Sequence, residues 1–268
     1  MTLGLVDTHT HVFTADGPYA PNARYRPGYA ASLPALQAQW RDNGVAHGVL
    51  IQPSFYGTDN SKLLAALAAS PDRLRGVVVV DANVSPTELE AWHVLGVRGI
   101  RHNLVGAGDH RVYGSDAWQR VYRDVARLGW HLEVHTEPGA LPDVLETLAA
   151  CPAPLVVDHF GRPDPARGLR CATFDALAAL AAQRAVFVKL SGAYRNGPAD
   201  CAAYAARLLA TLGPERLMWG SDWPWTSFED RGFAYAAFVT ELARWVPDAA
   251  TRRVVGCETP ARVFGFAP

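Results

Sequence analysis

The chain has 268 residues, of which 49% are hydrophobic and 19% are charged, and its formal net charge is -1. This length suits one large barrel or two ordinary domains, and the composition can bury a substantial core. Because no block of like charges stands out, there is no electrostatic reason to expect a nucleic acid or a membrane surface as a partner. No apolar segment reaches the roughly 20 residues that a membrane-spanning helix needs.

The N-terminal segment MTLGLVDTH leads directly into strand-like sequence, without the basic and apolar regions of a signal peptide. Four widely spaced cysteines, Cys151, Cys171, Cys201 and Cys257, form no CxxC pair. We therefore expect reduced thiols in a cytoplasmic protein. The expected partner is a small-molecule substrate, and both a monomer and a small homo-oligomer stay open.

Short runs rich in Val, Ile and Leu recur along the whole chain. Most are continuously apolar over three or four residues, a pattern typical of strands in a parallel sheet that is covered on both faces. In chain order the runs are LVDTHTH, GVLIQPS, LRGVVVVD, VRGIRHN, HLEVHT, PLVVDHF, VFVKLS and LMWGSDW.

Helix-like sequence separates several of these runs, for example at residues 62–70, 116–129 and 174–183. Another such segment, SPTELEAWHVLG, begins with a capping box of Ser85 and Glu88. Eight strands that alternate with helices predict an α/β fold, a single (β/α)8 TIM-type barrel domain over residues 1–268. A doubly wound open sheet is the alternative, although no glycine-rich dinucleotide motif follows any of the runs.

Ionisable residues gather where the runs end, which is the end of a barrel that carries active sites. His9 and His11 are two residues apart on a strand, so both side chains can face the barrel axis. His135 ends the fifth run and Asp222 the eighth, and the eighth strand of a closed barrel lies beside the first. Three histidines and one carboxylate predict a hydrolytic site for one divalent metal ion, with zinc as the expected ion. A metal-free site that uses the same residues for hydrogen bonding and base catalysis is the alternative.

The motifs VDTHTHVF, LEVHT, VVDHFGRPD and MWGSDWPW together resemble the amidohydrolase superfamily, in particular its amidohydrolase-related branch. Within that branch the chain is most similar to lactone hydrolases, which include the 2-pyrone-4,6-dicarboxylate lactonases and the sugar-lactone hydrolases. The resemblance extends over nearly the whole chain, from PYAPNARYRP after the first run to the tail ETPARVFGF.

This resemblance implies a role for each matching residue. His9, His11 and His135 match metal ligands, and Asp222 matches the general base that takes a proton from the attacking water. His159 matches the histidine that binds substrate or polarises the scissile carbonyl. Two arginines, Arg101 and Arg195, fall where related proteins hold substrate carboxylates, with Arg101 orienting the ring.

One departure concerns the metal. The pyrone-dicarboxylate type works without a metal and has a tyrosine at the position of His135, so the histidine here favours a metal-dependent lactonase. The alternative functions are a metal-dependent decarboxylase of an aromatic or muconate-type acid and a noncatalytic binding barrel.

Several other residues carry weaker expectations. Ser54 and Tyr56 follow the second run and are expected to hydrogen-bond substrate. Lys189, in the middle of VFVKLS, is expected either to bridge carboxylates inside the barrel or to reach substrate. Because neighbours on a strand face opposite sides, His102 is expected to pack away from the site, and Asp158 to face away from His159.

Overall fold

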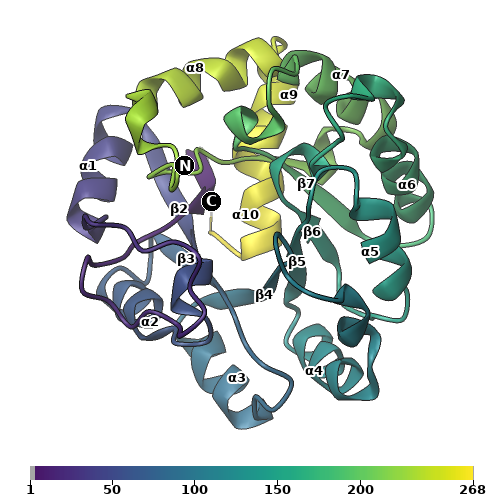
Figure 1. Cartoon of the computed structure of the whole chain (residues 1–268). Coiled ribbons are helices and arrows are strands. Elements are labelled where there is room, and N and C mark those ends of the chain that lie inside the picture. The colour runs from purple at the N-terminus through teal and green to yellow at the C-terminus, as the bar shows by residue number, and fades with distance from the viewer. Residues whose placement is uncertain (1–3, 268) are drawn as a thin grey trace.

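The computed structural model describes residues 4–267 and consists of eight parallel strands in sequential order, arranged as a nearly closed barrel. Figure 1 looks into the ring that these strands form. The predicted (β/α)8 fold is therefore confirmed, and the open doubly wound sheet was the wrong alternative. The strands are β1 (Leu5–Thr10), β2 (Val45–Ile51), β3 (Leu74–Val78), β4 (Val97–Asn103), β5 (His131–His135), β6 (Leu155–Val157), β7 (Val186–Leu190) and β8 (Leu217–Trp219).

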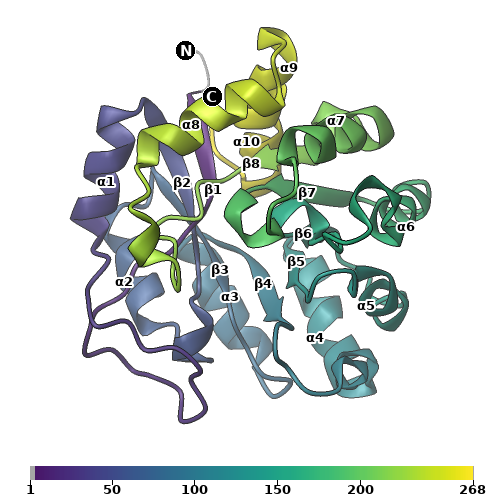
Figure 2. The same cartoon turned by 45° about the horizontal axis from the view of Figure 1, so that its top comes forward.

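Helices surround the strands on the outside of the barrel (Figures 1 and 2). The predicted capping box is present at the start of α3. The Ser85 side chain accepts from the Glu88 amide, and the Glu88 side chain accepts from the Ser85 amide. None of the described helices is long and apolar enough to cross a membrane. The helices are α1 (Leu33–Asp42), α2 (Ser61–Ala69), α3 (Pro86–Val94), α4 (Asp116–Arg127), α5 (Leu141–Thr147), α6 (Ala172–Ala181), α7 (Cys201–Leu212), α8 (Tyr235–Trp245), α9 (Ala249–Arg253) and α10 (Thr259–Phe264).

The last helix, α10, crosses the centre of the ring in Figure 1 instead of lying on its outside. Its buried residues Ala261 and Phe264 pack in one apolar cluster with strand residues such as Val6, Val156 and Met218. α10 therefore covers one end of the barrel.

Side chains and loop backbone complete the junction between β8 and β1. The Thr8 hydroxyl donates to the Trp219 carbonyl at 2.7 Å, and the Asp222 amide donates to the His9 carbonyl at 2.9 Å. The buried carboxylate of Asp7 accepts from the Ser221 amide at 2.8 Å and from the Ser221 hydroxyl at 2.6 Å. This junction fixes the loop after β8 against the end of β1.

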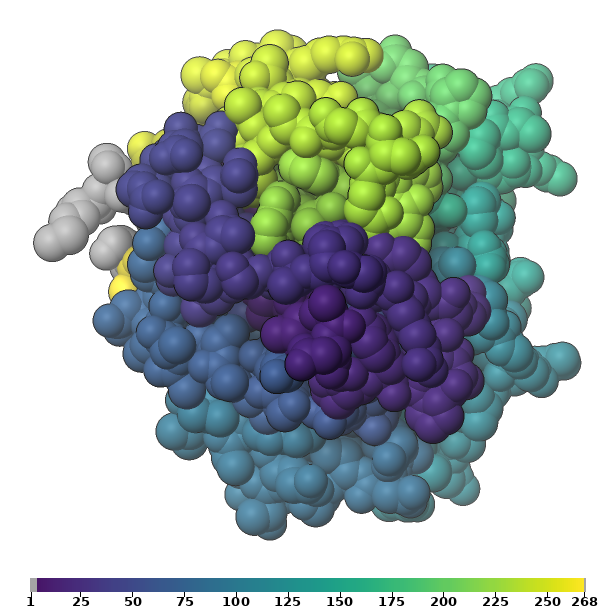
Figure 3. Space-filling view, turned by 60° about the vertical axis from the view of Figure 1, so that its left-hand side comes forward, coloured from purple at the N-terminus to yellow at the C-terminus, as the bar shows by residue number. Residues whose placement is uncertain are grey.

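The long loop between β1 and α1 lies over the barrel mouth and is tied to the loop that follows β8. The hydroxyls of Tyr25 and Tyr29 both donate to the carboxylate of Glu229. In Figure 3 the purple N-terminal segment packs directly against the yellow-green segment of the later loop and α8. These contacts hold the β1–α1 loop at the rim of the barrel.

His102 packs between the barrel and α4, as expected from its place on the strand. Its ring lies 4.6 Å from that of Trp118, and its Nε2 is 2.9 Å from the Tyr122 hydroxyl, which itself donates to the Tyr113 carbonyl. His102 Nε2 must therefore donate to Tyr122. Burial lowers the pKa of His102 from 6.5 to about 3.

This buried neutral imidazole predicts a loss of stability in mild acid. Between about pH 6.5 and pH 3 the unfolded chain binds a proton at His102 that the folded chain does not, so the free energy of unfolding decreases as pH falls. We expect His102→Phe to remove about 1.4 kcal/mol per pH unit from that slope. Urea unfolding between pH 7.5 and pH 4.5 measures it, with His110→Phe on a partly exposed loop position as the control. An unchanged slope in His102→Phe would contradict the prediction.

Candidate active site

A cavity of about 630 Å³ opens at the C-terminal ends of the strands. Of the nine residues predicted to form the site, all except Tyr56 line it. They are His9, His11, Ser54, Arg101, His135, His159, Arg195 and Asp222. The alternation of residues along β1 thus brings both histidines of the first motif to one cavity, as the sequence predicted.

The centre of the site is one carboxylate oxygen, Oδ1 of Asp222. It lies 3.6 Å from His9 Nε2 and 3.7 Å from His11 Nε2. Asp222 Oδ1 and His9 Nε2 are buried, and neither has a hydrogen-bond partner among the described residues. Two imidazoles and a carboxylate therefore converge on a space that no protein atom fills.

The opposite edge of the His11 imidazole determines which of its nitrogens carries the proton. His11 Nδ1 is 2.8 Å from the Ile51 carbonyl, which can only accept, so Nδ1 holds the proton and Nε2 presents a lone pair. His9 Nδ1 has two neighbours of opposite kind, a carboxylate oxygen of Asp158 at 3.2 Å and the ammonium of Lys189 at 3.4 Å. An acceptor of His11 therefore faces Asp222 Oδ1, and His9 Nε2 lies close to the same oxygen.

Part of this arrangement has the spacing of a metal site. Ligand atoms of a tetrahedral zinc lie roughly 3.3–3.4 Å apart when its bonds are about 2.0–2.1 Å long. The 3.6 and 3.7 Å separations around Asp222 Oδ1 are close to that spacing. His9, His159 and Asp222 form a set whose ligand atoms all lie within 4.8 Å of one another, and this set does not include His11. Its two imidazoles and one carboxylate fit a divalent ion such as zinc.

His135 occupies a different position from the one expected within that set. Its ligand atoms group with those of Asp158 and His159, while His9, His159 and Asp222 form a second group that shares His159. None of the groups found in the described part of the chain contains all four predicted ligands. The centroid of the shared His159 ring lies 4.7 Å from that of His135 and 4.8 Å from that of His9. Both ring nitrogens of His135 are buried and lack a hydrogen-bond partner within residues 4–267.

The other oxygen of Asp222, Oδ2, is fully engaged. Arg195 Nε and the Tyr194 hydroxyl each donate to it at 2.6 Å. Burial raises the pKa of Asp222, but the Arg195 guanidinium together with His159, His11 and His9 more than offsets this and holds the pKa well below the usual aspartate value. Asp222 is thus ionised at neutral pH and presents only Oδ1 to the cavity.

His159 reaches the cavity through an unusual backbone conformation. The residue has a φ of 52°, in the left-handed region, and its Nδ1 lies 2.9 Å from the Ser191 hydroxyl. The expectation that Asp158 faces away from His159 was wrong. Because β6 ends at Val157, strand alternation no longer applies, and both side chains turn inward.

A layer of ion pairs lies beneath the imidazoles. Nε and Nη2 of Arg101 donate to one oxygen of Asp158 at 3.0 and 2.8 Å, and Lys189 donates to Glu133. Lys189 is fully buried, so it bridges carboxylates inside the barrel and does not reach substrate. Arg101 still lines the cavity, although its guanidinium is already paired with a carboxylate of the protein.

Tyr56 was expected to contact substrate, but it lies outside the cavity. Its hydroxyl accepts from the Thr14 amide and donates to the Thr14 carbonyl, both at 2.9 Å. The Tyr56 ring packs edge-on against the ring of Phe55, and the residue is 2% exposed. Its geometry assigns Tyr56 to support of the β1–α1 loop, whereas Ser54 does line the cavity.

Sequence reasoning missed Tyr194, Glu133 and Arg24. Glu133 is two residues before His135 on β5, so strand alternation is the signal that could have placed it on the same inward face. Tyr194 and Arg24 lie in loops, where no periodicity indicates the direction of a side chain. Arg24 comes from the β1–α1 loop and lines the cavity.

Comparisons with known proteins agree with this geometry. The amidohydrolase family model matches residues 6–266. A 4-sulfomuconolactone hydrolase from Rhizobium radiobacter is 33% identical over 98% of this chain and 90% of its own length. A crystal structure from Pseudomonas putida, described as a candidate 2-pyrone-4,6-dicarboxylic acid hydrolase, has a TM-score of 0.91 at 36% identity and full coverage of both chains.

A more distant structure shares the fold. An amidohydrolase from Burkholderia multivorans, solved with bound zinc, has a TM-score of 0.81 at 24% identity and covers 98% of this chain and 99% of its own. The family model spans almost every residue, and the histidine pair, His159 and Asp222 lie at the expected strand ends. The chain therefore belongs to the amidohydrolase family.

Proposed function

We propose that this protein hydrolyses a lactone, with Asp222 as the general base that activates water. The observation that carries the proposal is the convergence of Asp222 Oδ1, His9 Nε2 and His11 Nε2 on one space at the cavity. A water molecule there can donate a proton to Asp222 while its oxygen lone pair is directed into the cavity. The lactone-hydrolysing relatives support a cyclic ester as the substrate class.

In the proposed reaction the water oxygen attacks the ester carbonyl carbon as Asp222 Oδ1 takes the proton. His159 is proposed to donate from Nε2 to the carbonyl oxygen, with its Nδ1, 2.9 Å from the Ser191 hydroxyl, accepting from that hydroxyl. Collapse of the tetrahedral intermediate breaks the ring C–O bond, and the proton on Asp222 passes to the departing ring oxygen. The product is the open hydroxy acid or its tautomer.

Three further side chains are proposed to hold substrate in place. Arg101 and Arg195 both line the cavity, and each has donors left after its pairing with Asp158 or Asp222. These donors face a substrate carboxylate and fix the orientation of the ring. Ser54, at the same rim, adds a hydrogen bond to a ring substituent.

We also propose that the site holds one divalent ion, zinc as the expected species, with His9, His11 and Asp222 as ligands. His135 is the fourth proposed ligand, since its nitrogens lack partners among the described residues. A bound ion would lower the pKa of the attacking water and polarise the carbonyl.

The general base is tested with Asp222→Asn. The variant keeps the size of the side chain but cannot accept the proton, so we expect lactone hydrolysis to fall by roughly 10²- to 10⁴-fold while the fold is retained. Proton release from a panel of lactones measures activity, and circular dichroism checks the fold. Asp230→Asn, at an exposed position in the same loop, is the matched control. Near-normal hydrolysis by Asp222→Asn would rule the mechanism out. Release of carbon dioxide without proton release by the wild-type chain would indicate the decarboxylase instead.

Metal content provides an independent test. We expect elemental analysis of the purified chain to find about one equivalent of a divalent ion, and His135→Gln to lower its affinity by roughly 10- to 100-fold, since the variant removes a ligand. His110→Gln, away from the cavity, serves as the control. A metal-free chain that hydrolyses lactones at full rate would assign the reaction to the metal-independent alternative.

A further inference from the structure

One cavity-lining arginine stands outside the ion pairs of the site. Three carboxylates belong to the site and the layer beneath it, namely Asp222, Asp158 and Glu133. Each is paired with a cation: Asp222 with Arg195, Asp158 with Arg101, and Glu133 with Lys189.

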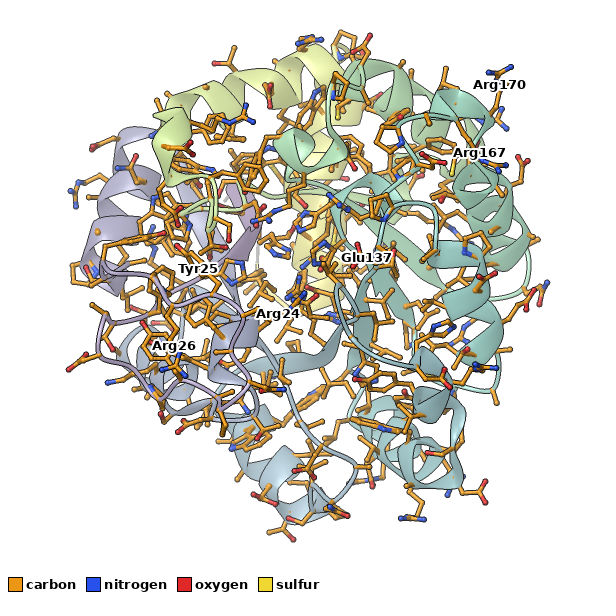
Figure 4. All side chains as sticks on the ribbon, viewed as in Figure 1. Arg24, Tyr25, Arg26, Glu137, Arg167 and Arg170 are labelled. Carbon is orange, nitrogen blue, oxygen red and sulfur yellow. The ribbon has the colours of Figure 1, made fainter. Side chains whose placement is uncertain are left out.

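Arg24 is the cavity-lining arginine outside these pairs. It lines the cavity from the β1–α1 loop, and it belongs to none of the ion pairs found within residues 4–267. Figure 4 shows Arg24 and Tyr25 at the inner side of this loop, towards the barrel axis, whereas Arg26 lies farther out. The nearby carboxylate of Glu137 accepts from the Gly106 amide at 2.7 Å and forms no ion pair with Arg24. Arg24 thus brings to the cavity a positive charge that is not held in an ion pair.

The loop after β4 leaves room for this guanidinium. A Cβ added to Gly106 would lie 2.0 Å from Arg24 Nη1 and 2.9 Å from Arg24 Cζ. Gly106 is therefore the position against which the head of Arg24 packs, and any side chain there would compete for the same space. Gly106 and Ala107 also line the cavity but offer no charged group of their own.

The loop also holds Arg24 in place from both sides. Its neighbour Tyr25 is bound to Glu229 in the loop after β8, and the Ala20 amide donates to the Phe55 carbonyl at 2.8 Å. A guanidinium carried by an anchored loop loses less conformational freedom when it binds an anion. Arg24 is thus presented at the mouth, on a different loop from the arginines that pair with Asp158 and Asp222.

We propose that Arg24 is a specificity-determining residue that binds an oxyanion on the outer end of the substrate. The proposal rests on the proposed lactone hydrolysis for the identity of the site, and it adds that the preferred substrate carries a second anionic group besides the one at Arg101 and Arg195. A planar carboxylate and a tetrahedral sulfonate share the oxyanion chemistry that a guanidinium recognises.

Binding of inert aromatic acids tests this inference without requiring turnover. Isothermal titration calorimetry of the full chain would compare benzoate with isophthalate, which adds a second carboxylate, and with 3-sulfobenzoate, which adds a sulfonate. We expect Arg24→Ala to weaken binding of isophthalate, of 3-sulfobenzoate or of both by roughly tenfold or more, and that of benzoate by less than about twofold. The acid that loses affinity identifies the type of oxyanion.

Arg26→Ala is the matched control, because Arg26 is on the same loop but packs over the Tyr19 ring, 5.4 Å from its centroid, outside the cavity. It should leave all three affinities unchanged. The inference is overturned if the wild-type chain binds neither dianion more tightly than benzoate, or if Arg24→Ala keeps that preference. A wild-type chain that hydrolysed no lactone would contradict the proposed function. That would be a separate result, since these titrations do not depend on catalysis.

Discussion

The approach of β8 to β1 is the constraint on which the candidate site depends. A Cβ on Gly220 would lie 2.7 Å from His9 Cβ, so the chain can pass this close to β1 only with glycine at that position. The next residue, Ser221, is bound to the Asp7 carboxylate by both its amide and its hydroxyl. Asp222 then adopts a left-handed φ of 60° and donates its amide to the His9 carbonyl. Two segments more than 200 residues apart in the sequence are thereby fixed to each other, and the base and the histidine pair are fixed with them.

The ion pairs around this junction determine what the site can do. Burying a carboxylate is costly unless it is paired or hydrogen-bonded. Glu133, Asp158 and Asp222 each have a cationic partner. The buried Asp7 carboxylate is held instead by hydrogen bonds from Ser221 and the Tyr235 hydroxyl. Pairing holds Asp222 ionised through Oδ2 and leaves Oδ1 free to accept. Dipoles and charges that are fixed before substrate arrives need little reorganisation during the reaction. The same network therefore explains both the low pKa of the proposed base and the geometry of the side chains around it.

Much of the fold could be predicted from the sequence because its signals are local. Continuous apolar runs indicated parallel strands, and a two-residue spacing placed His9 and His11 on one face. Reasoning from alternation failed where strands end: β6 stops at Val157, so Asp158 and His159 follow a turn instead of a pleat. Tyr56 was misplaced and Arg24 was missed for a related reason. The direction of a loop side chain depends on tertiary contacts, which no periodic pattern encodes.

Asp7→Asn tests the role of the junction most directly. The amide retains the size of the side chain but replaces one acceptor oxygen with a donor, which weakens the bonds to Ser221 without adding bulk. If the junction positions the base, kcat for lactone hydrolysis should fall by roughly 10- to 100-fold, because small displacements of a reacting group are costly, while KM changes by less than about twofold. Circular dichroism should show an intact barrel. A folded Asp7→Asn variant with the kcat of the wild-type chain would contradict the account.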